Sequence, residues 1–348
     1  MNNAAALEGV FNHFLESPVL LKDREVLRHD YIPNSLPHRE QHIRSLGEMV
    51  APLLRSARCS NIFIYGKTGT GKTAVTRFVL NKLSVKASEL GYPVKICYIN
   101  CRLAGTEYRV FSYMCDAINV NVPFTGLALG EVFDRFKNGL NTQKIFLIVV
   151  LDEVDALVKE RGDILLYELT RINETLHNSK TAVVGISNDL CFKELLDPRV
   201  LSSLSEEEIV FQPYNADELL DILRERARIA FNEGALSDGA VGLCAAMAAA
   251  EHGDARRALD LLRVAGELAE LEHSKSVSDG HIRLAEKRIE HDRVFEALRN
   301  LPSHSKLVLC SVFLLAKTGL KRIVTGEIFE VYRELCAQAS MSPLTQRE

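Results

Sequence analysis

The stretch Gly66–Thr73 reads GKTGTGKT and directly follows the apolar run NIFIY at Asn61–Tyr65. Glycines at this spacing let backbone N–H groups wrap around phosphates at the positive end of a helix. Lys72 is then expected to reach the β- and γ-phosphates, and Thr73 to hold Mg²⁺. The pattern predicts a nucleoside triphosphate site with a strand before the loop and a helix after it. Its predicted binding residues are Gly66, Lys67, Thr68, Gly69, Thr70, Gly71, Lys72, Thr73 and Ala74.

Short apolar runs separated by helical patterns continue along the chain as far as Phe211. They are rich in Ile, Val, Phe and Tyr, which is typical of a parallel sheet covered on both faces. From Asn215, a predicted N-cap, the pattern is helical only. The fold class is therefore α/β followed by an all-α part, with a boundary near Pro213. The predicted strands are Asn61–Tyr65, Val94–Asn100, Ile145–Leu151 and Thr181–Ser187, and the later helices are Val241–Ala250, Ala255–Glu272 and Gly280–Arg299.

Composition limits the classes of protein that fit. The 348 residues are enough for two or three cores, and 47% hydrophobic with 25% charged residues is ordinary for a globular protein. No apolar segment approaches membrane-helix length and the N-terminus does not resemble a secretory signal, so a cytoplasmic protein without a membrane partner is expected. The 8 cysteines, without a C-x-x-C pair, indicate reduced thiols. A net charge of −4 argues against a protein that coats nucleic acid, but leaves a local basic patch open.

Two carboxylates end the most apolar run of the chain. Asp152 and Glu153 follow Ile145–Leu151, and ligands of open α/β sheets bind at the carboxyl ends of the strands. Asp152 is expected to act on Mg²⁺ and Glu153 on the attacking water, with an acidic helix N-cap as the alternative. Asp155 is interpreted as acidity at a helix start. Asn188 ends another strand at the same edge, where it would polarise the water or touch the γ-phosphate; a turn is its ordinary role.

Further segments follow in a fixed order: LDEVD at 151–155, GISND at 185–189, DPRVLSSLSEEEIVFQPY at 197–214 and GDARRALDLLR at 253–263. This order resembles AAA+ ATPases. Within them, YIPNSLPHRE at 31–40 and VPFTGL at 122–127 resemble the archaeal replication initiators of the origin recognition complex and Cdc6 type. The resemblance extends from Asp30 to the last residue. It implies an N-terminal arm and AAA+ domain at 1–212, a helical lid at 213–290 and a partial winged-helix domain at 291–348.

The resemblance also implies ATP-site roles outside the phosphate loop. Arg256 matches the lid arginine that touches the γ-phosphate, and Asn188 matches the polar sensor; a solvated helix start is the alternative for Arg256, although a cation is unfavourable there. Arg199 matches an arginine that, in some AAA+ proteins, contacts the ATP bound to a neighbouring subunit. Helix capping is the alternative for Arg199. Boundary packing and a helix-surface charge are the alternatives for Tyr214 and Arg226. The further residues implied around the nucleotide are Tyr31, Ile32, Pro33, His38, Arg39, Tyr214 and Arg226.

Two segments are expected to face double-stranded DNA. In Tyr108–Phe136 and just beyond it, Arg135 and Lys137 would meet phosphates and Phe124–Leu127 would press on a groove, unless this is only a structural helix pair. The last segment resembles the start of a winged helix, with an apolar helix at Leu307–Ala316, a turn at Thr318-Gly319 and a helix capped by Thr325. From His281 to Arg333, ten Lys and Arg stand against six Asp and Glu, with Lys321-Arg322 as the expected phosphate contacts.

Ser342-Pro343 would begin a further helix, but only five residues follow. The family's recognition helix and wing would then be absent, so the chain resembles a truncated initiator.

The predicted function is that of a nucleoid-associated, ATP-dependent replication initiator that binds origin DNA and is switched by ATP binding and slow hydrolysis. A replicative helicase or its loader, and a homo- or hetero-oligomer on DNA, are the further expected partners. A clamp-loader-like or remodelling AAA+ machine, and a signalling ATPase that acts on a protein, are the alternatives.

Overall fold

The computed structural model describes residues 19–28, 31–123, 125–204, 207–318 and 322–345, in two compact units, Met1–Ile282 and Arg283–Glu348. Within the described part of the first unit, five strands form a parallel sheet in the order β2-β3-β4-β1-β5. Non-consecutive neighbours such as β4 and β1 require crossovers, which helices provide. The strands are β1 (Ile62–Gly66), β2 (Val94–Asn100), β3 (Phe146–Asp152), β4 (Lys180–Ser187) and β5 (Glu207–Phe211). The expected α/β class is confirmed.

Strand β5 was not expected from the sequence. It contains two glutamates and shows the exposure of an edge strand, with only Ile209 and Phe211 buried. Charged residues are depleted in strands but are common at sheet edges, where they discourage pairing with other chains. The strand pairs with β1 so that Phe211 lies beside Gly66. It therefore carries the chain from the sheet directly to the start of the helical part.

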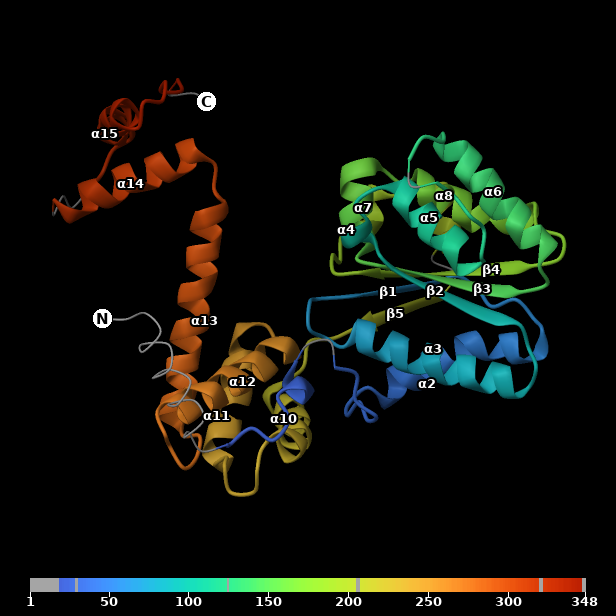
Figure 1. Ribbon diagram of the computed structural model, residues 1–348, viewed down its shortest axis with the longest axis horizontal. Coiled ribbons are helices and arrows are strands. Elements are labelled where there is room, and N and C mark those ends of the chain that lie inside the picture. Colours follow the sequence, from blue (N-terminus) through green and yellow to red (C-terminus); the bar gives the residue numbers. More distant parts are fainter. Residues whose placement is uncertain (1–18, 29–30, 124, 205–206, 319–321, 346–348) are drawn as a thin grey trace, which may run out of the picture. The chain divides into compact units, whose positions relative to one another are not determined.

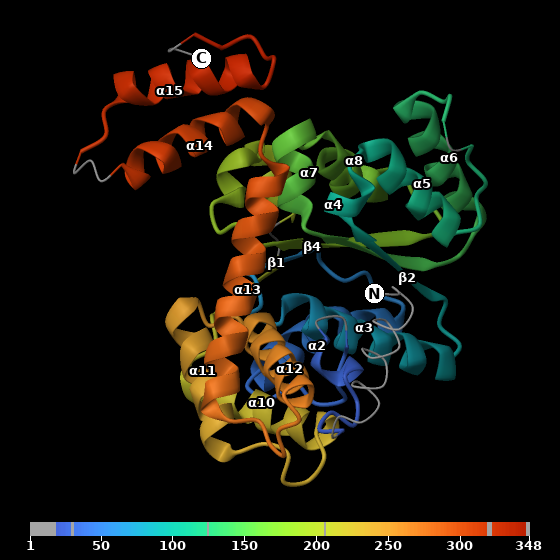
Figure 2. The same cartoon turned by 60° about the vertical axis from the view of Figure 1, so that its left-hand side comes forward.

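Helices cover both faces of the sheet (Figures 1 and 2). Successive strand residues point to opposite faces; Ile62 and Ile64 pack against α2 and α3, whereas Phe63 belongs to the core under α5 to α8. This double burial explains the continuous apolar runs. The covering helices are α2 (Glu40–Val50) and α3 (Lys72–Glu89) on one face, and α4 (Cys101–Ala104), α5 (Glu107–Ala117), α6 (Leu129–Thr142), α7 (Val154–Arg161), α8 (Ile164–Arg171) and α9 (Pro198–Leu204) elsewhere around the sheet.

In the described part of the first unit, three helices follow the sheet: α10 (Ala216–Ala230), α11 (Asp238–Glu251) and α12 (Ala255–Leu271). Asn215 caps α10 through a capping box with Glu218, which confirms the N-cap read from the sequence. We call these helices the lid. The arm residues 19–28 pack on the lid: Leu21 bridges to Phe231, and Lys22 donates its N–H to the carbonyl of Ala230.

Glu270 anchors the arm. It is 5% exposed, and its Oε1 accepts the backbone N–H groups of Leu20 and Leu21, each at 2.9 Å. Its Oε2 accepts from Arg24 at 2.5 Å. A carboxylate this deeply buried is stable only when such donors compensate it. The arm continues from this anchor through the short helix η1 (Glu25–Leu27) towards residues 31–39.

The second unit contains the continuation of α13 (Asp279–Asn300), then α14 (Ser303–Lys317) and α15 (Thr325–Gln338). α14 and α15 pack together, and Tyr332 hydrogen-bonds His304 at 2.8 Å. Thr325 is the first residue of α15 and not its cap; Val324 occupies that position, and its N–H bonds the Glu327 carboxylate. Residues 341–345 are not helical. Phe124, Gly319 and Lys321, three residues of the expected DNA-facing segments, lie outside the described residues.

In the part of the chain that the structure describes, no helix is long and apolar enough to cross a bilayer.

Candidate functional site: a nucleotide cavity under the lid

A cavity of about 560 Å³ lies in the first unit, where the phosphate loop, the arm and the lid meet. This volume is typical of small-molecule sites. Gly69 to Ala74 line it from the loop, Tyr31, Ile32 and Pro33 from the arm, and Tyr214, Arg226 and Arg256 from the lid and its linker. The structure therefore brings together in one cavity residues that are far apart in the sequence.

The phosphate loop ends on the helix that the sequence predicted. Gly71 caps α3 with φ of 91°, a conformation that is strained for other residues, and a Cβ there would lie 2.8 Å from the Tyr214 hydroxyl. Lys72 opens α3, and its Nζ donates to the carbonyls of Gly66 at 2.6 Å and Lys67 at 2.7 Å. Thr68 is exposed. Gly66, Lys67 and Thr68 do not line the cavity; the first two hold the lysine in place.

Burial lowers the pKa of Lys72 to about 8, although the nearby Asp152 carboxylate opposes that shift. Its ammonium group is held by neutral carbonyls, so negative charge arriving in the cavity would compensate it.

The lid touches the phosphate loop at Gly69. This residue has φ of 72°, and a Cβ there would overlap the Asp254 carboxylate. The N–H of Ala255 also donates to the Gly69 carbonyl at 3.2 Å. Only a glycine permits this approach. The first turn of α12 is therefore seated on the loop that is expected to hold the phosphates.

Asp152 and Glu153 stand at the carboxyl end of β3, as expected. Glu153 occupies the N-cap position of α7 in the left-handed region, with φ of 54°, and makes no capping hydrogen bond. Its carboxylate instead accepts from Asn100 Nδ2 at 3.2 Å and lies 3.7 Å from Arg102. A non-glycine residue held in this conformation is frequent at functional sites. The interpretation of Glu153 as a helix N-cap therefore does not account for the contacts of its side chain with Asn100 and Arg102.

Asp152 fits a role at a magnesium site. It is 6% exposed, and its Oδ1 accepts the Glu153 N–H at 3.0 Å. Its Oδ2 accepts from the Thr73 hydroxyl at 3.0 Å and from the Tyr98 hydroxyl. Because Thr73 uses its only proton on Asp152, its oxygen lone pairs are available to a cation. Hard oxygen ligands of this kind suit Mg²⁺.

Asn188 lines the cavity at the end of β4, and its backbone N–H donates to Asp155 Oδ1 at 3.2 Å. Asp155 lies in the first turn of α7, as the sequence indicated. It also ties the end of β4 to the start of α7, a contact that the sequence did not predict. This hydrogen bond ties the backbone of Asn188 to the first turn of α7, and Asn188 lines the same cavity as Asp152 and Glu153.

The two lid arginines behave differently. Arg257 is 3% exposed and makes two hydrogen bonds to Glu251, at 3.1 and 3.2 Å, so it is a structural residue. Arg256 is exposed and lines the cavity, and within the described residues no carboxylate pairs with it. The Asp254 side chain caps α12 by accepting the backbone N–H groups of Arg256 and Arg257. An unpaired cation at the start of a helix is unfavourable unless an anion is bound nearby, which favours the ligand-binding interpretation.

The arm residues divide into two groups. Tyr31 lies under the Arg226 guanidinium, with 4.6 Å from its carbon to the ring centroid, and both residues line the cavity. Arg226 is 7% exposed and donates to the carbonyl of Val26 at 3.2 Å, and burial lowers its pKa. His38 does not line the cavity; it contacts Asp221 at 3.0 Å.

Arg39 also lies outside the cavity lining. It is 3% exposed and donates to the carbonyls of Thr70 at 2.9 Å and Gln212 at 2.7 Å. Its guanidinium carbon lies 3.7 Å from the centroid of the Tyr214 ring. It thus joins the arm, the phosphate loop and the linker to the lid. Among the arm residues implied by the resemblance, Arg39 contacts the loop itself and is placed to position it.

Arg199, expected to act on a neighbour's ATP, is exposed and pairs with Asp197 at 3.1 Å. It does not belong to the cavity of its own chain. Arg135 and Lys137, the expected phosphate contacts on α6, pair with Glu131 and Asp134 of the same helix at 2.7 and 2.8 Å. Exposed pairs of this kind are weak and can exchange for another anion.

Sequence reasoning missed part of the cavity. Arg102 and Leu103 come from α4, Arg77 from α3 and Asn100 from the end of β2; Arg28 comes from the arm and Ile222, Glu225 and Leu259 from the lid. Asn100 alone carried a usable signal, because it ends a predicted strand just as Asn188 does.

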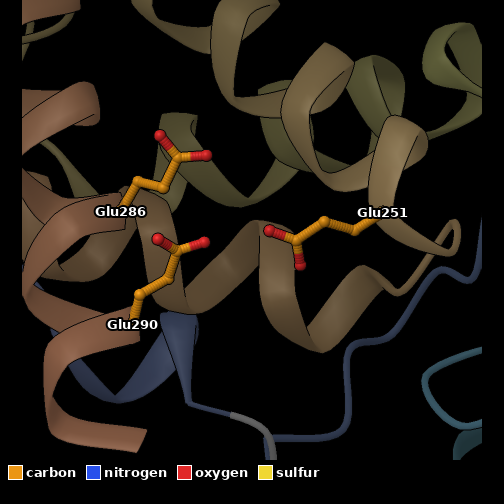
Figure 3. Close-up of side chains that lie close together, drawn as sticks. All are labelled: Glu251, Glu286 and Glu290. Carbon is orange, nitrogen blue, oxygen red and sulfur yellow. The ribbon is translucent and has the colours of Figure 1, made fainter. Parts of the chain in front are cut away.

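Acidic residues on the helices α11 and α13 are not assigned as a metal site. Glu286 and Glu290 lie one helical turn apart on α13, and Figure 3 shows both side chains on that helix. Glu251, at the end of α11, is the partner of Arg257. Partly exposed acidic groups occur commonly without a bound ion, so we assign none here.

Family models and known proteins match almost the whole chain. An AAA domain model matches residues 55–187, a Cdc6 AAA+ ATPase-type lid domain 220–287, and a CDC6 C terminal winged helix domain 296–348. The ORC1-type DNA replication protein of Thermococcus onnurineus is 48% identical over 345 residues, which are 98% of this chain and 83% of the relative. The chain belongs to the family of ORC1-type DNA replication proteins.

Solved structures agree with this ORC1-type assignment. The Aeropyrum pernix ORC1 protein, solved in complex with DNA, has a TM-score of 0.85 at 50% identity, covering 94% of this chain and 85% of that one. Cdc6p from Pyrobaculum aerophilum, at 24% identity and a TM-score of 0.68, covering 94% of this chain and 87% of that one, shares the fold. The family, the fold class and the replication function predicted from the sequence are confirmed. As an ORC1-type protein, the chain carries an AAA+ ATPase domain, a lid and a winged-helix segment.

Proposed function

We propose that this ORC1-type protein is a replication initiator whose DNA binding is switched by ATP. The observation that carries the proposal is the placement of Arg256, from lid helix α12, in the same cavity as the phosphate loop. A guanidinium supplied by one side of a cavity and a phosphate loop by the other would make the seating of the lid depend on the ligand. Asp254 against Gly69 gives that seating a defined contact.

The residues around the cavity take the following proposed roles. Lys72 and the N–H groups of the loop bind the phosphates, and Thr73 with Asp152 holds Mg²⁺, which neutralises phosphate charge. Glu153 orients the attacking water, and Asn188 polarises that water or contacts the γ-phosphate. Tyr31, Ile32 and Pro33, with Tyr214 and Arg226, close over the base and ribose. His38 and Arg39 act from outside the cavity by fixing the arm and the loop.

Hydrolysis is proposed to be slow and to serve as a reset, because a switch depends on occupancy more than on turnover. Arg199 is proposed to act on the ATP of a neighbouring copy or relative bound to the same DNA. Its exposure and its absence from the residues that line the cavity of its own chain support this role.

Double-stranded origin DNA is the proposed ligand of this nucleoid-associated protein. A replicative helicase or its loader is the proposed protein partner. DNA binding by the Aeropyrum pernix ORC1 protein, the match to a winged-helix model and the exposed arginines and lysines of the second unit support the DNA proposal. Domain boundaries near residues 212 and 290 are proposed with it.

The test measures the affinity for labelled duplex DNA by fluorescence anisotropy in ATP, in ADP and without nucleotide. We expect affinity to differ among the three states and to fall as salt is raised. The Lys72→Ala variant, which should lack nucleotide, is the control and should give one affinity throughout. Equal affinities for the wild type in all three states would contradict the switch. Absence of any salt-sensitive binding to DNA would favour the signalling alternative, and fast turnover in a closed ring would favour the clamp-loader alternative.

Glu153→Gln separates binding from chemistry. We expect the ATP affinity to stay within a few-fold of the wild-type value, because the Glu153 carboxylate contacts Asn100 and Arg102 and not the phosphate loop. The kcat should fall by about 100-fold or more. Turnover is measured by phosphate release under single-turnover conditions, with Glu160→Gln, an exposed residue of the same helix α7, as the matched control. Unchanged turnover would remove Glu153 from the reaction.

A further inference from the structure

Tyr98 lies next to the proposed magnesium site without lining the nucleotide cavity. It belongs to β2, which pairs in parallel with β3 so that Asn100 lies beside Asp152. Residues two apart on a strand point to the same face, so Tyr98 and Asn100 share the face on which Asp152 lies. The Tyr98 hydroxyl accordingly donates to Asp152 Oδ2.

Asp152 is therefore held by three separate elements. Thr73, from α3, donates to Oδ2 at 3.0 Å, Tyr98, from β2, donates to the same oxygen, and the N–H of Glu153 donates to Oδ1 at 3.0 Å. Two hydroxyls on a single carboxylate oxygen fill its in-plane acceptor positions. The carboxylate is left with one orientation, and that orientation is the one in which it also binds Thr73.

Tyr98 is itself held in place. The Arg77 guanidinium lies over its ring, with 4.4 Å from the guanidinium carbon to the ring centroid. Arg77 follows Thr73 by four residues, one turn further along α3, and lines the nucleotide cavity. A phenylalanine at position 98 would keep this stacking and the strand pairing and would lose only the hydroxyl. The substitution therefore removes the contacts of the hydroxyl with Asp152 and Arg77 and leaves the aromatic ring in place.

We propose that Tyr98 is a positioning residue that acts through Asp152 on the affinity for the divalent cation and not on the affinity for the nucleotide alone. The inference rests on the proposed ATP and Mg²⁺ site. The groups that orient metal-binding carboxylates contribute strongly to metal affinity even though they never touch the metal. A purely structural role, in which the bond only fastens β2 to β3, would change stability and leave the dependence on Mg²⁺ untouched.

The test is Tyr98→Phe, assayed with a fluorescent ATP analogue titrated against Mg²⁺ and, separately, in EDTA. We expect the Mg²⁺ concentration for half-maximal binding to rise by about tenfold, while the affinity in EDTA is unchanged. Tyr65→Phe is the matched control: Tyr65 is also a strand tyrosine of this sheet, and its hydroxyl donates to a carboxylate, Glu208, at 2.9 Å. This control should titrate like the wild type.

An unchanged Mg²⁺ requirement in Tyr98→Phe would overturn the role of Tyr98 and leave the proposed site intact. A wild type whose nucleotide binding does not respond to Mg²⁺ would overturn both.

A double-mutant cycle with Asp152→Asn gives a second measurement, independent of how much Tyr98→Phe lowers stability. Residues that act through one another have non-additive effects. If Tyr98 acts through Asp152, adding Tyr98→Phe to Asp152→Asn leaves the Mg²⁺ requirement at the value of Asp152→Asn alone. Additive shifts would overturn the proposal.

Discussion

The two walls of the nucleotide cavity are held in place by different kinds of contact. On the sheet side, the loop from Gly66 to Thr73 and the pair Asp152-Glu153 are continuous segments at the ends of strands whose cores are fully buried. On the other side, the arm and lid depend on contacts such as Arg226 with Val26 and Glu270 with Leu20, 200 and 250 positions apart. The residues of the sheet wall are therefore supported directly by the buried core of the sheet, whereas the junction of arm and lid also depends on a few buried polar groups.

The largest effect is expected on the sheet wall. Lys72→Ala should lower ATP affinity by about 100-fold or more, because charged hydrogen bonds of about 1.5–3 kcal/mol each to phosphate are lost. Equilibrium binding of a fluorescent ATP analogue measures the loss. Lys82→Ala, an exposed lysine of the same helix, is the control. Tight binding by Lys72→Ala would show that the loop is not the site.

Arg39 tests whether the two walls are joined. Arg39→Met should lower the free energy of unfolding by about 3 kcal/mol, since the carbonyls of Thr70 and Gln212 lose their donor. ATP affinity should fall with it, because the loop is held from behind. Denaturant unfolding and nucleotide titration are the measurements, and Arg44→Met, an exposed arginine of α2, should change neither. A stable variant with normal affinity would mean that the walls are independent.

Glu270 tests the arm-and-lid wall by itself. Glu270→Ala should lower the free energy of unfolding by about 2 kcal/mol, because two backbone N–H groups and Arg24 lose their acceptor. The arm should then be cleaved faster by trypsin at Lys22 and Arg24. Glu267→Ala removes a half-exposed partner of Arg263 on the same helix and serves as the control. Equal cleavage rates for the two variants would show that Glu270 does not anchor the arm.

The smallest effect is expected at Arg199. Because Arg199 is exposed and its ion pair with Asp197 lies at the surface, Arg199→Ala should leave the melting temperature and single-chain ATP binding unchanged. If it serves a neighbour, the variant should lose turnover only where chains assemble, so ATPase activity is compared across protein concentrations with and without duplex DNA. Loss of ATP binding at high dilution would place Arg199 in its own site instead.

Local motifs explain what could be predicted from the sequence. The phosphate loop, the strands β1 to β4, the Asn215 cap and the pair Asp152-Glu153 each depend on neighbours within a few residues, and the structure contains all of them. Strand β5 escaped prediction because its two glutamates suit an edge strand but not an isolated pattern. Thr325 was expected to cap α15, yet the chain enters that helix one residue earlier, at Val324.

The rest depends on contacts between distant segments. No sequence pattern near Tyr98 indicates that its hydroxyl donates to Asp152, 54 positions later. Nor does the sequence distinguish Arg256, which faces the cavity, from Arg257, which is buried against Glu251. His38 and Arg39 were implied as nucleotide contacts only through the resemblance, and their placement outside the cavity follows from where the arm crosses the loop.

Arg39 has a consequence for how this protein can vary. Its guanidinium donates to the main-chain carbonyls of Thr70, His38 and Gln212, and every amino acid supplies such a carbonyl. Replacing the side chain of Gln212 leaves its acceptor in place, whereas inserting one residue between Phe211 and Tyr214 moves that acceptor away. The hydrogen bonds of the Arg39 guanidinium therefore tolerate a change of side chain at Gln212 but not the insertion of a residue before Tyr214, whose ring the guanidinium also contacts.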